Sequence, residues 1–250
     1  MESLKWKGFK EVKVVKKIEE SIGIYSFYLK DLDNKELPKF LAGQFIAIRV
    51  KNKDNTYTKP RQYTLSMNHK DDSYRISVKR EENGYVSKVL VDEVNEGDTI
   101  EITMPLGNFF LKDNNRNVVL IGGGIGVTPM LTMAYEAANS SKNVKFIYST
   151  QNLENHSFKD EIEKLCEENS NITSTIFYTR AAEETANNSG CISGRISREW
   201  MEENLDKDSE FYFCGPTEFM RCVYRNLVSM GINKEDINFE MFDKGDDITK

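Results

Sequence analysis

The sequence predicts two domains of different class, an antiparallel β-barrel followed by a doubly wound parallel sheet. The chain has 250 residues, 39% of them hydrophobic and 30% charged, which is typical of globular proteins. Short runs in the first 112 residues alternate between polar and apolar positions, as half-buried strands do. From residue 118 onward, apolar runs alternate with helical segments, which is the pattern of a parallel α/β sheet.

Six short runs separated by turn-forming clusters predict the strands of the barrel. They cover residues 12–18, 24–29, 44–50, 62–66, 74–79 and 99–103, and a helical insert is expected at 86–93.

The second half predicts five strands, the first of them fully apolar, at residues 118–121, 144–148, 175–178, 211–213 and 237–241. Helices are expected between them at 129–139, 158–168, 197–204 and 217–230. The polar segment Lys112–Asn117 separates the halves, so we place the domains at 1–114 and 115–250.

The net charge of −6 is unevenly distributed along the chain. Up to residue 112 there are 20 Lys and Arg against 17 Asp and Glu, and from residue 113 there are 14 against 23. Six of the first 17 residues are lysines. They indicate either an edge strand protected from aggregation or a docking surface for an acidic protein. Basic residues are not interleaved with aromatic ones, which argues against a nucleic-acid partner.

Several features predict a cytoplasmic location. No apolar stretch approaches 18 residues, so no membrane span is expected, and the first seven residues lack the apolar core of a signal peptide. The four cysteines are scattered and form no C-x-x-C pair, so we expect reduced thiols and no metal site.

The clearest motif is Gly122–Pro129, which lies between the apolar strand and a helix. Its four glycines let the backbone approach a ligand closely, and the helix N-terminus offers N–H groups to a phosphate. The alternative is a tight turn without a ligand.

Three further motifs are weaker when taken alone. In Arg61–Ser66 the strand period places Arg61 and Tyr63 on one face, where they could grip a phosphate and stack on a flat ring, with Gln62 and Thr64 on the other. Gly84–Leu90 opens a short helix, which favours either an anion site or a plain cap. Cys214 ends an apolar strand at the edge where doubly wound sheets bind ligands, although burial is the commoner fate of a free cysteine.

Two histidines, His69 and His156, lie in polar loops, and we expect them at the surface rather than in catalysis.

Taken in order, these segments resemble the ferredoxin–NADP reductase superfamily, and residues 74–111 look most like the reductase half of flavohemoglobins. The resemblance covers nearly the whole chain and implies an FAD-binding barrel followed by an NAD(P)-binding domain. On the barrel it implies that Arg61, Gln62, Tyr63, Thr64, Gly84, Val86 and Ser87 contact FAD, with Tyr63 stacked on the flavin and Thr64 near its N5 atom. On the second domain it implies a dinucleotide phosphate loop at Gly124, Gly126 and Thr128, Cys214 beside the nicotinamide, and Glu240 and Phe242 as the terminal acid and the aromatic cover of the flavin.

The same resemblance leaves the nicotinamide donor open. Thr179 and Arg180 are similar to the pair that grips the 2′-phosphate in NADPH-specific relatives, whereas residues 149–152 look like those of reductases that use NADH. We favour NADPH slightly and expect NADPH or NADH.

Three departures from the family bear on function. Phe45 stands where many relatives have a tyrosine. Neither a globin-length segment before the barrel nor a ferredoxin cysteine pattern is present in this sequence, so we expect no heme and no [2Fe–2S] cluster. The residues 243–250 extend past Phe242 and could loosen its stacking.

The function that the resemblance implies is an NAD(P)H-dependent flavin oxidoreductase that passes single electrons to a soluble redox protein such as ferredoxin, flavodoxin, a globin or an iron–sulfur protein. Thr64, Cys214 and Glu240 would surround the reacting atoms. The alternatives are a flavin or ferric reductase with a diffusible acceptor, an FAD-binding subunit of a larger complex, and a nicotinamide sensor.

Overall fold

The computed structural model describes residues 5–52, 54–68, 73–242 and 247–249. The chain divides into two compact units, Met1–Phe110 and Leu111–Lys250, and each is described by itself. Within the described residues, no helix combines the length and the apolar character that a membrane span requires.

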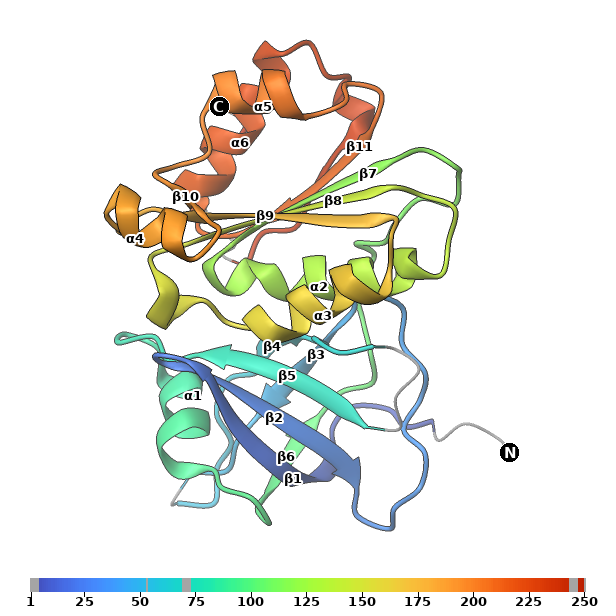
Figure 1. Ribbon diagram of the computed structural model, residues 1–250. Coiled ribbons are helices and arrows are strands. Elements are labelled where there is room, and N and C mark those ends of the chain that lie inside the picture. The colour runs from blue at the N-terminus through green and yellow to red at the C-terminus, as the bar shows by residue number, and fades with distance from the viewer. Residues whose placement is uncertain (1–4, 53, 69–72, 243–246, 250) are drawn as a thin grey trace. The chain divides into compact units, whose positions relative to one another are not determined.

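In the described part of the first unit, six strands form one antiparallel sheet with the order β4-β3-β6-β1-β2-β5 (Figure 1). The strands are β1 (Lys10–Ser21), β2 (Ile24–Asp31), β3 (Phe45–Arg49), β4 (Arg61–Thr64), β5 (Tyr74–Lys79) and β6 (Thr99–Ile102). The two edge strands meet just beyond β4, where Leu65 pairs with Ile76 and the Ser66 amide donates to the Arg75 carbonyl at 2.8 Å. This contact closes the sheet into the predicted barrel.

The lysine-rich strand β1 is not an edge strand, which corrects one of the two interpretations of its charge. It pairs with β6 through Lys10–Lys13 and with β2 along most of its length. Val12 and Val14 are buried in the core, and Lys13 between them is exposed. Lys10 pairs with the buried Asp31 at 2.8 Å, so part of this charge serves the barrel itself.

The predicted helical insert consists of α1 (Tyr85–Lys88) followed directly by a π-helical turn at Val89–Glu93. Val86, Leu90 and Val91 bury it against the barrel core. The Lys17 ammonium donates to the carbonyl oxygens of Val91 and Val94, both at 2.7 Å. A cation there satisfies carbonyl groups that the end of a helix leaves free.

In the described part of the second unit, six parallel strands have the order β10-β9-β8-β7-β11-β12 (Figure 1). They are β7 (Val118–Gly123), β8 (Val144–Thr150), β9 (Ile172–Tyr178), β10 (Ile192–Ser193), β11 (Glu210–Cys214) and β12 (Ile237–Phe239). The order runs one way from β7 to β10 and the other way from β7 to β12. The carboxyl ends of β7 and β11 therefore form the topological switch point, where doubly wound sheets bind ligands.

Helices cover both faces of this sheet. They are α2 (Val127–Ala138), α3 (Lys159–Glu168), α4 (Glu183–Asn188), α5 (Arg198–Asn204) and α6 (Thr217–Ser229). In Figure 1, α2 and α3 lie on one face, and α5 and α6 on the other. The α5/α6 face packs through Met201, Met220 and Leu227 onto Ile121 and Phe213 of the sheet. The short elements α4 and β10 were not predicted, because neither carries an apolar period long enough to recognise.

The units divide between Phe110 and Leu111, four residues before the boundary expected from the sequence. Hydrogen bonds explain the difference. The Lys112 amide donates to the Tyr212 hydroxyl at 2.9 Å, and the Asn114 amide group donates to the buried Glu210 carboxylate at 3.0 Å. The polar segment after residue 110 is therefore held by the second unit.

The C-terminal extension also contacts the second unit. Ile248 is 1% exposed and belongs to the apolar core of that unit. Residues 243–246 and 250 lie outside the described part, and the effect of this extension on the stacking of Phe242 stays a prediction.

Candidate functional site

Strand β4 presents the first predicted group. Its register pairs Arg61 with Ile48 and Tyr63 with Ile46, so both lie on one face, as the alternation predicts. Arg61 and Gln62 are exposed, whereas Tyr63 is half-buried against the barrel core. Burial raises the pKa of the Tyr63 hydroxyl above its ordinary value, so this ring is neutral over the physiological range.

The hydroxyl group of Thr64 is buried without a hydrogen-bond partner among the described residues. The Thr64 side chain is 5% exposed, and its Oγ1 atom makes no hydrogen bond within the described residues. A buried hydroxyl without a partner costs about 1–3 kcal/mol. Such a group is accounted for when a ligand atom supplies the missing partner.

The start of α1 holds the second predicted group, Gly84, Val86 and Ser87. The backbone of Gly84 has φ −83° and ψ 128°, which any residue adopts. Space is what requires glycine there, because a Cβ atom would lie 2.3 Å from Ser87 Oγ and 3.0 Å from Glu81 Cβ. Ser87 Oγ accepts from the Glu81 amide at 3.3 Å. No side chain caps the helix, so its N-terminal end is open to an anion.

At the switch point of the second unit, the glycine loop packs against the end of β11. A Cβ atom on Gly126 would lie 2.3 Å from the Cys214 carbonyl oxygen and 2.5 Å from the Gly215 nitrogen. Gly124 has φ +51°, a left-handed conformation that favours glycine. Thr128 is buried and its hydroxyl donates to the Ile125 carbonyl at 2.9 Å. Its first role is therefore to hold the turn, and its lone pairs remain available to accept.

Cys214 and Glu240 form the second half of this site. Cys214 is 0% exposed at the end of β11, and the amide of Glu240 lies 3.4 Å from the Phe213 carbonyl oxygen on the same strand. Burial, and then the neighbouring Glu240, raise the pKa of the Cys214 thiol well above its usual range. Burial raises the pKa of Glu240 to about 7. The pair is thus a neutral thiol beside a carboxyl group that holds its proton near neutral pH.

Phe242 follows two residues later, with a ring that is 45% exposed. An aromatic ring left open to solvent in its own unit has a face available for stacking.

Thr179 and Arg180 lie just beyond β9, at the same edge of the sheet. Their amides donate to the carbonyls of Thr150 and Gln151 at 2.9 and 2.8 Å. The Arg180 guanidinium also donates to Gln151 Oε1 at 2.9 Å. Gln151 was not singled out from the sequence for this contact, because nothing local links two residues 29 positions apart.

His156 is buried, which corrects the surface position expected from the sequence. Its ring is 7% exposed, and its Nδ1 atom lies 3.0 Å from the Tyr178 hydroxyl. Burial lowers the pKa of His156 from 6.5 to about 4, so the ring is neutral at physiological pH. It pins the loop after β8 to the end of β9. His69 lies outside the described residues.

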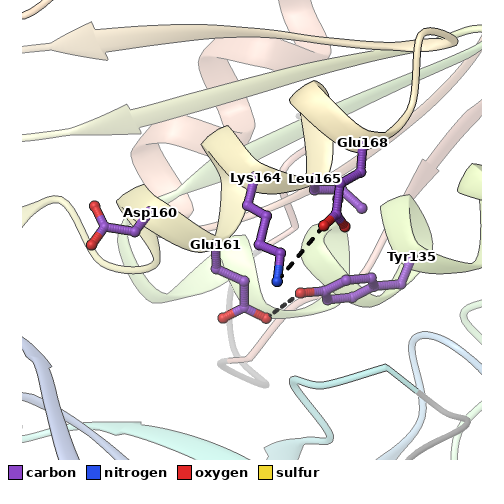
Figure 2. A pocket seen from close by; sticks show the side chains of 6 residues that line it. All are labelled: Tyr135, Asp160, Glu161, Lys164, Leu165 and Glu168. Carbon is purple, nitrogen blue, oxygen red and sulfur yellow. Dashed lines mark hydrogen bonds and ion pairs between the residues drawn. The ribbon is translucent and has the colours of Figure 1, made fainter.

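A pocket of about 360 Å³ lies against α2 and α3 and contains none of the predicted site residues (Figure 2). Four of its polar side chains form two pairs: the Tyr135 hydroxyl donates to Glu161 at 2.5 Å, and Lys164 pairs with Glu168 at 3.7 Å. Within the described residues, no group of three or more His, Cys, Asp or Glu is arranged to hold a metal ion.

Comparison with known proteins agrees with this architecture. The oxidoreductase FAD-binding domain family matches residues 10–111, and the oxidoreductase NAD-binding domain family matches residues 120–225. The flavohemoprotein of Bacillus cereus is 36% identical over 247 residues, which are 95% of this chain and 61% of that protein.

Two solved structures are similar in fold. The flavohem-like FAD/NAD-binding domain of nitric oxide dioxygenase from Vibrio cholerae has a TM-score of 0.83 and 31% identity, and the match covers 92% of this chain and 97% of that one. The flavohemoglobin from Malassezia yamatoensis with bound FAD and heme has a TM-score of 0.83 and 26% identity, covering 94% of this chain and 60% of that one.

A barrel unit with an open helix start and a doubly wound unit with a glycine loop define a flavin- and nicotinamide-dependent oxidoreductase. The chain belongs to the ferredoxin–NADP reductase family of FAD- and NAD-binding oxidoreductases and is similar to the reductase part of flavohemoproteins. It spans about 61% of the length of the curated relative given above. The unpartnered Thr64 hydroxyl fits a bound FAD, because a flavin atom could supply its missing hydrogen-bond partner.

Proposed function

We propose that this chain transfers a hydride from NAD(P)H to FAD and then passes the electrons singly to a protein acceptor. FAD supplies the redox chemistry when bound, because it takes up a hydride at N5 and releases electrons one at a time. The observation that carries the proposal is the switch point. There, the glycine loop, the neutral Cys214 thiol and the high-pKa Glu240 carboxyl gather at the carboxyl ends of neighbouring strands.

On the barrel, Arg61 and the start of α1 would bind the FAD diphosphate, while Gln62 and Tyr63 would contact the flavin. The Arg61 guanidinium is exposed and can form charge-assisted hydrogen bonds. Val86 fixes the position of the helix start by its burial in the core. The unpartnered Thr64 hydroxyl would donate to a flavin atom such as N5.

On the second unit, Gly124, Gly126 and Thr128 would hold the dinucleotide phosphates, with Cys214 and Glu240 orienting the nicotinamide. Hydride transfer needs no strong base, so alignment is the main contribution of these side chains. Glu240 can hold a proton on its carboxyl group near pH 7. The exposed Phe242 ring would stack on the flavin.

The electron acceptor in this proposal is a protein. The similar proteins named above are flavohemoproteins, and heme takes one electron at a time. A globin, a flavodoxin, a ferredoxin or another iron–sulfur protein would have the same need. Among donors we favour NADPH, because the exposed Arg180 and the Thr179 hydroxyl lie at the ligand edge of the sheet.

The test is an anaerobic absorbance spectrum of the purified full chain, before and after adding NADH or NADPH. Flavin bands at about 375 and 450 nm should bleach with one or both nucleotides. Protein that stays colourless after incubation with FAD would refute the proposal. Reoxidation then separates the acceptors: faster turnover with cytochrome c than with free flavin or ferric citrate supports a protein acceptor, and the reverse order contradicts it.

A further inference from the structure

The loop that follows β8 occupies the position at which dinucleotide-binding sheets distinguish their two donors. Strand β8 lies next to β7, the strand that carries the glycine loop. In such sheets an acidic residue near the end of this neighbouring strand binds the ribose 2′-hydroxyl of NAD, whereas an arginine accommodates the 2′-phosphate of NADP. Here the strand ends at Thr150, and the next residue is the neutral Gln151.

Gln151 holds Arg180 without cancelling its charge. A second exposed arginine, Arg195, lies at the same edge just beyond β10. Arg180 donates to the Gln151 side-chain oxygen at 2.9 Å, and their backbones bond at 2.8 Å. Among the residues described, no carboxylate pairs with this guanidinium. A guanidinium has five N–H donors, so one bond to an amide leaves a charged, planar fork that matches a phosphate.

The loop that carries Gln151 is held rigidly. Thr150 Oγ1 donates to the Asn155 carbonyl at 2.8 Å, and the Asn155 amide donates to Asn152 Oδ1 at 3.1 Å. The buried His156 bonds Tyr178 on β9, and Phe158 is held at φ +60° with its ring buried. A left-handed backbone at a bulky residue persists only when its surroundings enforce it. These contacts hold the backbone of the loop that carries Gln151.

We propose that Gln151 is a positioning residue for donor selection: it aims Arg180 at the 2′-phosphate of NADPH and, being uncharged, leaves that arginine's charge for the phosphate. The inference rests on the proposed function, in particular on Arg180 as the phosphate contact. A carboxylate at position 151 would form an ion pair with Arg180 and repel the 2′-phosphate, while it could accept from the 2′-hydroxyl of NADH.

The experiment measures binding of two adenosine fragments to the FAD-loaded full chain by calorimetry: 2′,5′-ADP, which carries the 2′-phosphate, and 5′-ADP, which lacks it. The variants are Q151E, R180A and a charge control, S170E. Ser170 is exposed in the turn before β9, so S170E adds the same charge at the opposite end of the strand that leads to Arg180. Seven residues span about 20 Å, which exceeds the screening length of about 8 Å.

We expect the unmodified chain to bind 2′,5′-ADP at least about tenfold more tightly than 5′-ADP. Q151E should lose at least about tenfold for 2′,5′-ADP and less than about twofold for 5′-ADP. R180A should remove the preference, and S170E should retain it. The kcat/KM ratio of NADPH to NADH should move in parallel.

The possible failures are distinguishable. A chain that binds both fragments equally has no 2′-phosphate contact, and the donor preference and this inference both fall, whereas bleaching of the flavin by NADH would still support the oxidoreductase. A preference that is lost in R180A but kept in Q151E overturns the role of Gln151 alone. Loss of preference in S170E would mean that overall charge, not the position of Gln151, decides the donor.

Discussion

Replacing Gly126 with alanine measures how tightly the glycine loop packs against the end of β11. The new Cβ atom would lie 2.3 Å from the Cys214 carbonyl oxygen and 2.5 Å from the Gly215 nitrogen. Both are backbone atoms and cannot rotate away. Gly126 has φ −65° and ψ −3°, which alanine adopts without strain. Steric overlap is therefore the main cost of the substitution.

The magnitude follows from that overlap. Carbon atoms in ordinary contact are about 3.5 Å or more apart, so the two backbone segments must separate by about 1 Å. Overpacking of this kind costs about 1–3 kcal/mol, and a backbone neighbour places it at the upper end, about 3 kcal/mol. Gly124→Ala is the matched control. Gly124 has φ +51°, and no atom lies within 4 Å of the point where its Cβ would stand, so alanine there costs only the left-handed strain of about 1 kcal/mol.

The assay is urea unfolding followed by the fluorescence of Trp200. The sequence contains only one other tryptophan, Trp6 in the first unit, so a Trp6→Phe background restricts the signal to the second unit. Gly126→Ala should lose about 2 kcal/mol more than Gly124→Ala and should bind NAD(P)H more weakly while retaining FAD. Equal stability of the two variants would refute the close approach of the loop to β11.

Three further predictions concern titration and a single cation. The pKa of His156 falls from 6.5 to about 4 on folding, so as the pH is lowered His156 is protonated in the unfolded chain before it is protonated in the folded one. Stability should then be fully present above pH 6.5 and decline by up to about 3 kcal/mol as the pH falls to 4; a His156→Gln variant whose unfolding free energy keeps the same pH slope would contradict this. Because the pKa of Glu240 is about 7, the rate of flavin reduction should change with an apparent pKa near that value. Glu240→Gln should show the low-pH rate at every pH, and an unchanged profile would exclude Glu240. Lys17→Met removes two bonds to carbonyls at the end of the π-helical turn and should destabilise the first unit by about 1–3 kcal/mol, whereas the exposed Lys16→Met should not; equal melting temperatures would show that Lys17 does not cap the turn.

The positions of most strands and helices could be predicted because periodicity is a local property. Alternation in 24–29 and 74–79, and the apolar run at 118–121, fall within β2, β5 and β7. The short β10 has two residues and exists only because β9 offers it a backbone to pair with. A two-residue element leaves no periodic signal in a sequence.

The interpretation of the lysine-rich strand as an edge strand was wrong, because the order in which strands pair cannot be predicted from alternation. Nothing in the alternation of residues 12–18 shows how many neighbours a strand has. Strand β1 lies between β6 and β2, so its lysines do not protect the edge of a sheet. A docking surface for an acidic protein remains a prediction. Fewer lysines are available for it, because Lys10 and Lys17 bind groups of the barrel itself.

The sequence by itself predicted the two fold classes and the glycine loop, because each depends on residue type and on spacing within one segment. The candidate cofactor residues came from the resemblance to a family and stay predictions. The tertiary structure decided which of those residues meet. It places the Gly126 Cα against the backbone of Cys214, Arg180 against Gln151, and His156 in a buried contact with Tyr178. These contacts join segments from neighbouring parallel strands, and parallel pairing brings together residues that the chain separates by a whole helical crossover.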